Sequence, residues 1–232
     1  MKRRSATANR IVEAGRKAFN LKGYVAASVT EIAASLNISQ GNLTYHFPTK
    51  RELAMAIEDD ALQIMKERRN RPGSGALADD YAEHLLFWMD LTWRYRFIMR
   101  DRVQYADQPL GKRPDSRLLS SYDELLGLLH RAGKQGILIE NHGLEIDVLA
   151  RSLWIVSRHW VDSLRELEGL DEPDWSDQER GIRHHMAILS PCLKAKARRE
   201  FEAALKAAML RPGLQDPADG SVAQTGHGPW RS

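Results

Sequence analysis

Residues 28–50, which read SVTEIAASLNISQGNLTYHFPTK, decide the fold of the N-terminal part of the chain. Ser28 and Ser39 each stand where a hydroxyl can cap the start of a helix. Pro48 ends the second of these helices, because proline cannot continue the helical hydrogen-bond pattern. The stretch therefore predicts two short helices joined by a tight turn at 36–38.

The second predicted helix presents a polar face without an acidic residue. This face carries amide, hydroxyl and imidazole groups, at Gln40, Asn42, Thr44, Tyr45 and His46. A helix fits the major groove of duplex DNA, where base edges present a sequence-specific pattern of donors and acceptors. The helix pair therefore favours the docking geometry of a helix-turn-helix.

The positive charge of the chain is concentrated at its N-terminal end. Residues 1–51 hold nine Lys and Arg against two Asp and Glu, whereas the remaining 181 residues hold 25 against 29. A basic end on a mildly acidic body favours a polyanion as the partner of that end alone. Lys2, Arg3, Arg4 and Arg10 are expected to follow a DNA backbone or to enter a flanking minor groove.

Helical periodicity dominates the rest of the 232-residue chain, and no Asn-Gly or Asp-Gly turn separates alternating apolar runs. Gly23 is placed to end a first helix that starts near Thr7. Leu77 opens a long helix, rich in aromatic residues, that is expected to reach Tyr105. Pro191 is expected to break or kink the last helical stretch. We predict an all-α protein whose remaining helices occupy about 49–69, 115–139, 146–167 and 176–210.

Three spaced motifs carry a resemblance to a known family. They read Phe19…Gly23-Tyr24, then Thr30-Glu31-Ile32-Ala33, then Gly41-Asn42-Leu43-Thr44-Tyr45-His46-Phe47 followed by Lys50 and Leu53. With these motifs, residues 7–55 resemble the DNA-binding domain of the tetracycline-repressor (TetR) family. Thr44 departs from the family pattern, which often has tyrosine there, so the base preference at this position is an open question.

The resemblance implies a domain organisation and a set of DNA contacts. It implies an N-terminal three-helix helix-turn-helix domain over 1–52 and a helical-bundle domain for ligand binding and dimerisation over 53–210. Residues 211–232 are rich in Pro, Gly, Asp and Gln and are expected to form a disordered tail. The implied DNA-contacting residues are Thr30, Ser39, Gln40, Gly41, Asn42, Thr44, Tyr45, His46 and Lys50.

By the same resemblance, the protein is a transcriptional regulator and most simply a repressor. It is expected to bind a near-palindromic operator in double-stranded DNA as a homodimer and to leave it when a small-molecule inducer binds. The helices at about 146–168 and 176–190 match the family's dimerisation helices in position and in their apolar faces.

Aromatic side chains of the second domain are candidates for lining the inducer pocket, with a histidine or arginine to orient an anionic group. These candidates are Trp88, Trp93, Arg96, Trp154 and His159. The alternative interpretation of any one of them is a side chain of the apolar core, because aromatic residues at helical spacing most often pack inside a bundle. Both interpretations stay open at this point.

Two other classes of function compete with DNA binding. An all-helical enzyme acting in the aromatic-rich pocket needs a positioned acid–base pair or nucleophile, and the sequence contains no Gly-x-Ser-x-Gly, P-loop or His-Glu-x-x-His motif. A membrane-surface module needs an aromatic-rich amphipathic face, which the basic arm lacks. No apolar run approaches the roughly 20 residues that span a bilayer. We therefore expect a cytoplasmic protein with no cofactor and, since Cys192 is its single cysteine, no cysteine-based metal site.

Overall fold

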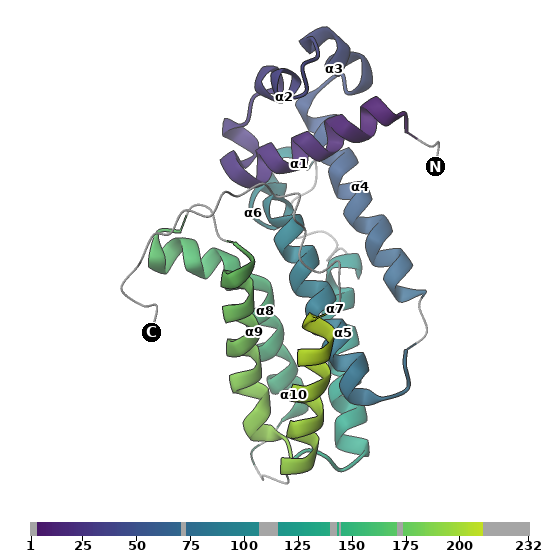
Figure 1. Ribbon diagram of the computed structural model, residues 1–232, viewed down its shortest axis with the longest axis vertical. Coiled ribbons are helices and arrows are strands. Elements are labelled where there is room, and N and C mark those ends of the chain that lie inside the picture. Colours follow the sequence, from purple (N-terminus) through teal and green to yellow (C-terminus); the bar gives the residue numbers. More distant parts are fainter. Residues whose placement is uncertain are drawn as a thin grey trace. The chain divides into compact units, whose positions relative to one another are not determined.

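The computed structural model describes residues 4–70, 73–106, 116–139, 143, 145–170 and 174–210, with the backbone alone for 116–120. Over these residues the secondary structure consists of ten α-helices, one short 3₁₀ helix and a single isolated β-bridge (Figure 1). The predicted all-α fold is therefore confirmed. The predicted tail over 211–232 and the basic residues Lys2 and Arg3 lie outside the described residues.

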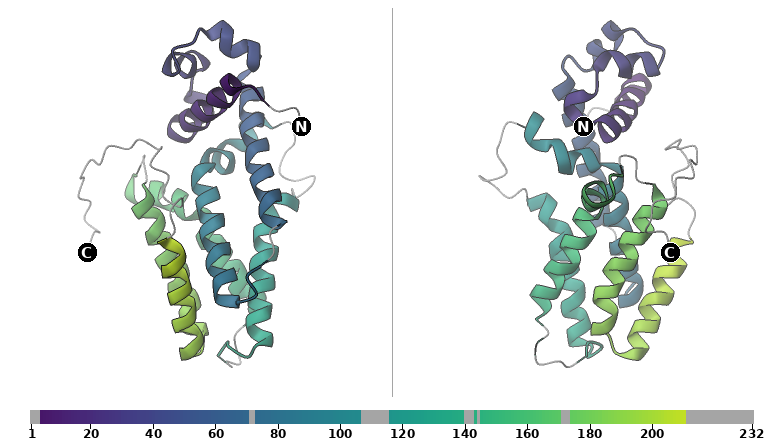
Figure 2. Two further views of the ribbon diagram at one scale, coloured as in Figure 1. Left: turned by 45° about the vertical axis from the view of Figure 1, so that its right-hand side comes forward. Right: turned by 90° about the vertical axis from the view of Figure 1, so that its left-hand side faces the viewer.

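The first of two compact units has α1 at its centre. Its helices are α1 (Ala6–Ala26), α2 (Val29–Ser35), α3 (Gln40–His46), α4 (Lys50–Arg69) and α6 (Arg96–Tyr105). α1 packs against each of the other four (Figure 2). The approach of α1 to α4 is close at Gly15, where an added Cβ would lie 2.9 Å from the Leu53 side chain. Ile11 and Phe19 of α1, Ile32 of α2 and Leu43 of α3 are all buried and contribute to the apolar core of this unit.

Side-chain hydroxyl groups cap the starts of α2, α3 and α4. The side-chain oxygens of Ser28, Ser39 and Thr49 each accept a hydrogen bond from a backbone N–H two or three residues further on, at 3.1–3.2 Å. Each cap satisfies one of the N–H groups that a helix leaves unpaired at its start. The predicted starts of α2 and α3 are confirmed.

A glycine interrupts α1 near its end. Gly23 has φ +83° and ψ 160°, a backbone conformation that side chains with a Cβ rarely adopt. The regular helix therefore breaks at the predicted residue, although a further helical turn carries α1 to Ala26.

The predicted single helix over 77–105 is wrong, because it is divided into α5 and α6 at Tyr95. Tyr95 leaves the helical conformation, with φ −120° and ψ 31°. Asn20 of α1 supports the break: its carboxamide accepts the N–H of Phe97 at 3.2 Å and donates to the carbonyl of Arg94 at 2.8 Å. No glycine or proline stands here, so the sequence pattern carries no signal of the division.

The second compact unit is a helical bundle that contains almost all of α5 (Leu77–Arg94). Two apolar clusters meet on this helix: one joins it to α7 (Ser116–Lys134), α8 (Ile146–Glu168), the end of α9 (Trp175–Leu189) and α10 (Ala195–Met209), the other to α9 and α10. Between α9 and α10 the chain forms a 3₁₀ helix over Ser190–Cys192, which is the predicted break at Pro191.

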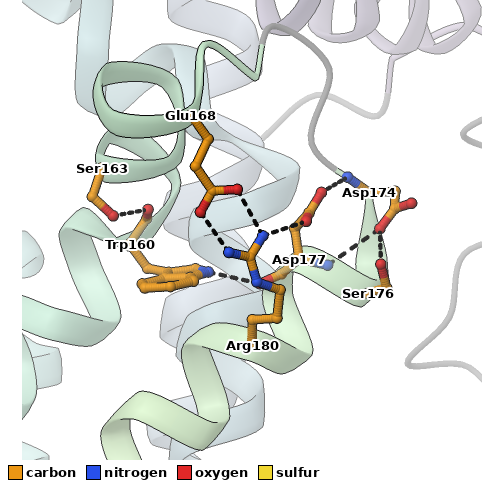
Figure 3. A network of polar contacts seen from close by, with 7 residues as sticks. All are labelled: Trp160, Ser163, Glu168, Asp174, Ser176, Asp177 and Arg180. Carbon is orange, nitrogen blue, oxygen red and sulfur yellow. Dashed lines mark hydrogen bonds and ion pairs between the residues drawn. The ribbon is translucent and has the colours of Figure 1, made fainter. Parts of the chain in front are cut away.

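A polar network holds the end of α8 to the start of α9 (Figure 3). The Arg180 guanidinium pairs with both Glu168 and Asp177, and the indole N–H of Trp160 donates to the carbonyl of Asp177 at 2.6 Å. Gly181 lets the Trp160 ring approach, since a Cβ there would lie 2.5 Å from a ring carbon. The α8–α9 hairpin is therefore fixed by charge, hydrogen bonding and a close aromatic contact together.

The compact units divide the chain elsewhere than at the predicted domain boundary after residue 52. α4 packs on α1, and Arg102 of α6 pairs with Glu58 of α4 at 3.0 Å. Both helices therefore group with the N-terminal ones, and the boundary between functional domains stays a prediction. In the part of the chain that the structure describes, no helix is both long and apolar enough to cross a membrane.

Candidate nucleic-acid interface

Helix α3 is anchored by one apolar side chain and exposes most of the others. Leu43 is only 1% exposed, whereas Tyr45 is 83% exposed. Since successive residues of a helix are turned by about 100°, positions 41 and 45 lie opposite Leu43. Two pairs of polar residues flank this line, Gln40 with Thr44 on one side and Asn42 with His46 on the other.

Gly41 makes the middle of this face flat. The position is exposed, and an added Cβ would meet only the Ser39 hydroxyl, at 3.9 Å. No constraint within the protein therefore requires glycine at this position. A glycine there allows another backbone or a base edge to approach the helix closely.

Two hydrogen bonds fix the polar side chains of one flank. The Thr30 hydroxyl of α2 donates to the side-chain oxygen of Gln40 at 2.9 Å. The Thr44 hydroxyl donates to the carbonyl of Gly41 at 3.2 Å. These bonds restrict the rotamers of both residues before any partner arrives, so less conformational entropy is lost on binding.

Tyr45 and His46 project from the end of α3, with their rings edge to face at a centroid distance of 5.2 Å. Asn42 is exposed on the same helix, and its backbone N–H is used by the Ser39 cap. The face consequently offers hydroxyl, amide and imidazole groups without a carboxylate, which suits the mixed donors and acceptors of a DNA groove.

Lys50 is tied to the end of α1 as well as being the first residue of α4. Its ammonium donates to the carbonyl of Val25 at 2.9 Å and lies 4.8 Å from the centre of the Tyr24 ring. Partial burial lowers the pKa of this ammonium, because removal from water disfavours the charged form. Lys50 therefore joins α1 to α4 beside α3 and places a positive charge there.

Two neighbouring residues of α6, Arg100 and Asp101, bind the backbone of α1 on either side of its break, and we call this pair the clasp. The Asp101 carboxylate accepts the N–H of Tyr24 at 2.7 Å and pairs with Arg100 at 2.8 Å. Arg100 also donates to the carbonyl of Phe19 at 2.8 Å. The Tyr24 ring, which lies against Lys50, is in turn packed on Tyr105 at 5.1 Å. Sequence reasoning missed this clasp, because neither α6 residue stands near the motifs in the chain.

Arg4 of the basic N-terminal end is engaged within the protein. Its guanidinium binds the Asp60 carboxylate at 2.6 and 2.9 Å and the carbonyl of Ala56 at 3.0 Å. The expectation that Arg4 follows the DNA is therefore not supported, because its donors are used on α4. The bond holds the start of α1 against α4.

The five ligand-site candidates are distributed over both units. Arg96 belongs to the first unit, whereas the other four belong to the second. Trp88 is buried and donates to Glu124 at 2.9 Å; Trp154 is half-buried and donates to Ser121 at 2.9 Å. Trp93 and Arg96 are half-buried, while His159 lies on the exposed side of α8.

The second unit also contains a buried polar chain that sequence reasoning missed. The Tyr81 hydroxyl lies 2.7 Å from Nε2 of His185, and Nδ1 of His185 lies 2.7 Å from the Ser157 hydroxyl. Ser157 donates to the carbonyl of Leu153 at 3.0 Å, so it accepts from Nδ1–H, and Nε2 accepts from Tyr81. Burial lowers the pKa of His185 to about 3. Sequence spacing gave no signal because the three residues stand on three different helices.

The capped helix pair, the polar face of α3 and the basic charge beside it define a helix-turn-helix DNA-binding protein. Comparison with family models agrees: a model of bacterial regulatory proteins of the tetR family matches residues 11–57, and a TetR model of a bacterial transcriptional repressor matches residues 58–201. The chain belongs to the TetR family of bacterial transcriptional regulators. This assignment does not support the enzymatic alternative.

Solved structures share the fold. A TetR-family regulator from Marinobacter aquaeolei VT8 has a TM-score of 0.69 and 22% identity, over 88% of this chain and 99% of that one. The ketosteroid transcriptional regulator KstR2 of Mycobacterium tuberculosis has a TM-score of 0.61 and 15% identity, over 83% and 97%. An ArpA-like gamma-butyrolactone receptor has a TM-score of 0.58 and 18% identity, over 89% and 99%. None of the curated proteins compared with the chain matches it.

Proposed function

We propose that this regulator reads a near-palindromic operator with α3 of each subunit of a homodimer and that a small organic molecule releases it. The exposed, acid-free face of α3 is the observation that carries the proposal. In this proposal Gln40, Thr44 and Tyr45 face base edges. Ser39, Gly41, Asn42 and His46 line the same contact, and Thr30 and Lys50 support it from α2 and α4. The site of action is the cytoplasm, where bacterial DNA lies.

The apolar faces of α8 support dimerisation through this helix. One face packs into the bundle through Leu153 and Leu164, whereas Val148 and Ile155 on another face are 57% and 48% exposed. A helix with two apolar faces can pack on its own core and on a partner. Two-fold pairing would place the two copies of α3 about 34–36 Å apart, which is one turn of DNA.

The names of two structural neighbours support a small organic effector, since one is a ketosteroid regulator and the other a gamma-butyrolactone receptor. In this chain, Trp88, Trp93 and Trp154 supply aromatic surface in the second unit, and Glu124 and Ser121 supply polar groups beside them. An effector reduces DNA affinity only if it binds more tightly to the state that does not bind DNA.

Selection of duplexes from a random library tests the proposal directly. The purified protein is incubated with the library at moderate salt, and bound duplexes are recovered and sequenced. Enrichment of an inverted repeat with half-sites one turn apart is the expected result. Enrichment of a single, unrepeated site would contradict the dimer, and the absence of any enriched sequence would contradict sequence-specific reading.

A single variant assigns the enriched sequence to α3. Gln40→Ala keeps an exposed helix position and removes an amide that can bond a base edge. We expect the enriched motif to lose one position per half-site with Gln40→Ala. An unchanged motif would exclude Gln40 from base reading.

A further inference from the structure

The hydroxyl of Thr44 is directed at its own helix. It donates to the carbonyl of Gly41 at 3.2 Å, one turn earlier in α3. Threonine has only two groups on its Cβ, the hydroxyl and a methyl group. Because the hydroxyl proton is donated within the helix, the hydroxyl has no free proton to donate to a base, and its acceptor oxygen and the methyl group remain for a partner.

Thr44 stands on the reading face of α3. Thr44 is half-exposed and follows Gln40 by one turn, on the same side of the line through Gly41 and Tyr45. Because Gly41, which borders Gln40 and Thr44 on this face, has no side chain, the helix can approach a groove closely here.

We propose that Thr44 is a specificity-determining residue that recognises the methyl group of a thymine in each operator half-site. The proposal rests on the proposed reading of DNA by α3. In the major groove, the C5-methyl group of thymine is the one apolar feature of a base edge, and a threonine methyl group is among the side-chain groups that contact it. Because the Thr44 hydroxyl donates its proton to the helix, donation to a base edge is left to other residues.

The position of Gln40 predicts where the thymine lies within the half-site. The Thr30 hydroxyl holds the side-chain oxygen of Gln40 at 2.9 Å, which fixes the amide one turn before Thr44. Four residues of helix rise about 6 Å, and base pairs are stacked about 3.4 Å apart. The thymine read by Thr44 therefore lies within about two base pairs of the base read by Gln40.

The test uses the duplex that the protein itself enriches from a random library. Each thymine is replaced in turn by deoxyuridine, which removes the methyl group and leaves base pairing intact. Dissociation constants are measured for the wild-type protein, Thr44→Val and Thr44→Ser. Val keeps a methyl group and lacks the hydroxyl, whereas Ser keeps the hydroxyl and lacks the methyl group. Thermal melting of each variant establishes that it is folded.

We expect one thymine per half-site whose replacement weakens wild-type binding about fourfold, the value of one buried methyl group. Thr44→Val keeps this sensitivity and Thr44→Ser loses it. The sensitive thymine lies within two base pairs of the position whose preference Gln40→Ala abolishes.

The outcomes separate this inference from the function on which it rests. A library that yields no enriched sequence overturns both. An enriched inverted repeat without a uracil-sensitive thymine overturns the role of Thr44 alone. Sensitivity that survives in Thr44→Ser, or that is lost in Thr44→Val, also overturns it, because the hydroxyl or another residue would then be the reader.

Discussion

Helix α3 and the core of the second unit use the same kinds of polar side chain in opposite ways. On α3, Gln40, Tyr45 and their neighbours are exposed and only partly engaged within the protein. In the second unit, Tyr81 and His185 are buried and satisfy each other. The same phenol or imidazole therefore serves recognition in one place and internal cohesion in the other.

The difference shows that residue type alone does not identify a functional side chain. Burial of a polar group is costly unless its hydrogen bonds are replaced, and Tyr81 and Ser157 replace them for His185. On the exposed face of α3, a bound partner would supply these hydrogen bonds. Changes to the core should therefore alter stability and leave DNA reading intact, whereas changes to α3 should do the reverse.

The largest expected effect is on the stability of the second unit. Gly181→Ala places a Cβ 2.5 Å from the Trp160 ring and 2.8 Å from Met89, so overpacking should destabilise the protein by about 3 kcal/mol. Unfolding in urea measures this. The matched control is Gly127→Ala on α7, where nothing lies within 4 Å of the added Cβ. Equal stability of the two variants would contradict the close packing of the α8–α9 hairpin.

Acid should destabilise the buried chain next most strongly. Burial lowers the pKa of His185 to about 3 from its ordinary value near 6.5, so between these pH values the unfolded chain binds a proton that the folded chain does not. The stability due to neutral His185 is thus complete above pH 6.5 and falls as the pH is lowered, by up to about 1.4 kcal/mol per pH unit.

Unfolding free energies of the wild-type protein and His185→Phe, measured from pH 7 to 5, test this. The variant should be less stable at pH 7 but lose less stability on acidification. Tyr81→Phe is the control, because it removes the hydrogen bond and keeps the imidazole buried. Parallel pH profiles for wild type and His185→Phe would exclude a buried neutral histidine.

On α3 the expected effect is on DNA affinity. Gly41→Ala adds a methyl group at the centre of the exposed face, and we expect affinity for the enriched duplex to fall about tenfold, or about 1.4 kcal/mol. The folded protein should not become less stable, since the new Cβ meets only the Ser39 hydroxyl at 3.9 Å and alanine favours helix. Fluorescence anisotropy and thermal melting measure the two. Unchanged affinity would show that α3 does not lie close to DNA.

The smallest expected effect concerns the clasp from α6. Asp101→Asn keeps an oxygen for the N–H of Tyr24 but loses the charge that pairs with Arg100, so stability should fall by about 1 kcal/mol. Because Tyr24 lies against Lys50, DNA affinity should fall slightly as well. Chemical denaturation and titration with the enriched duplex measure both effects. A stability equal to that of the wild-type protein would show that the pair contributes nothing to the clasp.

The sequence predicted the helix-turn-helix well because its signals are local. Ser28 and Ser39 cap the helices that follow them, and Gly23 breaks α1 where its conformation requires glycine. The division at Tyr95 was missed because Asn20, more than seventy residues earlier, supplies the bonds that support it. A contact between distant segments leaves no periodic trace in the sequence.

The same reason explains what was missed around the candidate sites. Asp101 holds Tyr24, and Asp60 holds Arg4, through pairs that no spacing rule connects. The aromatic candidates of the second unit illustrate a further limit, since a tryptophan that lines a pocket and one that fills a core have the same helical spacing. Their role as ligand contacts stays a prediction.

The preference of the protein for its enriched duplex over a scrambled duplex tests the central claim most directly. Both dissociation constants are measured at several salt concentrations, for the wild-type protein and for Gln40→Ala. We predict a wild-type preference of about a thousandfold or more that falls at least tenfold in the variant, while affinity for the scrambled duplex is unchanged. A preference that is the same in both proteins would contradict the assignment of sequence reading to the face of α3.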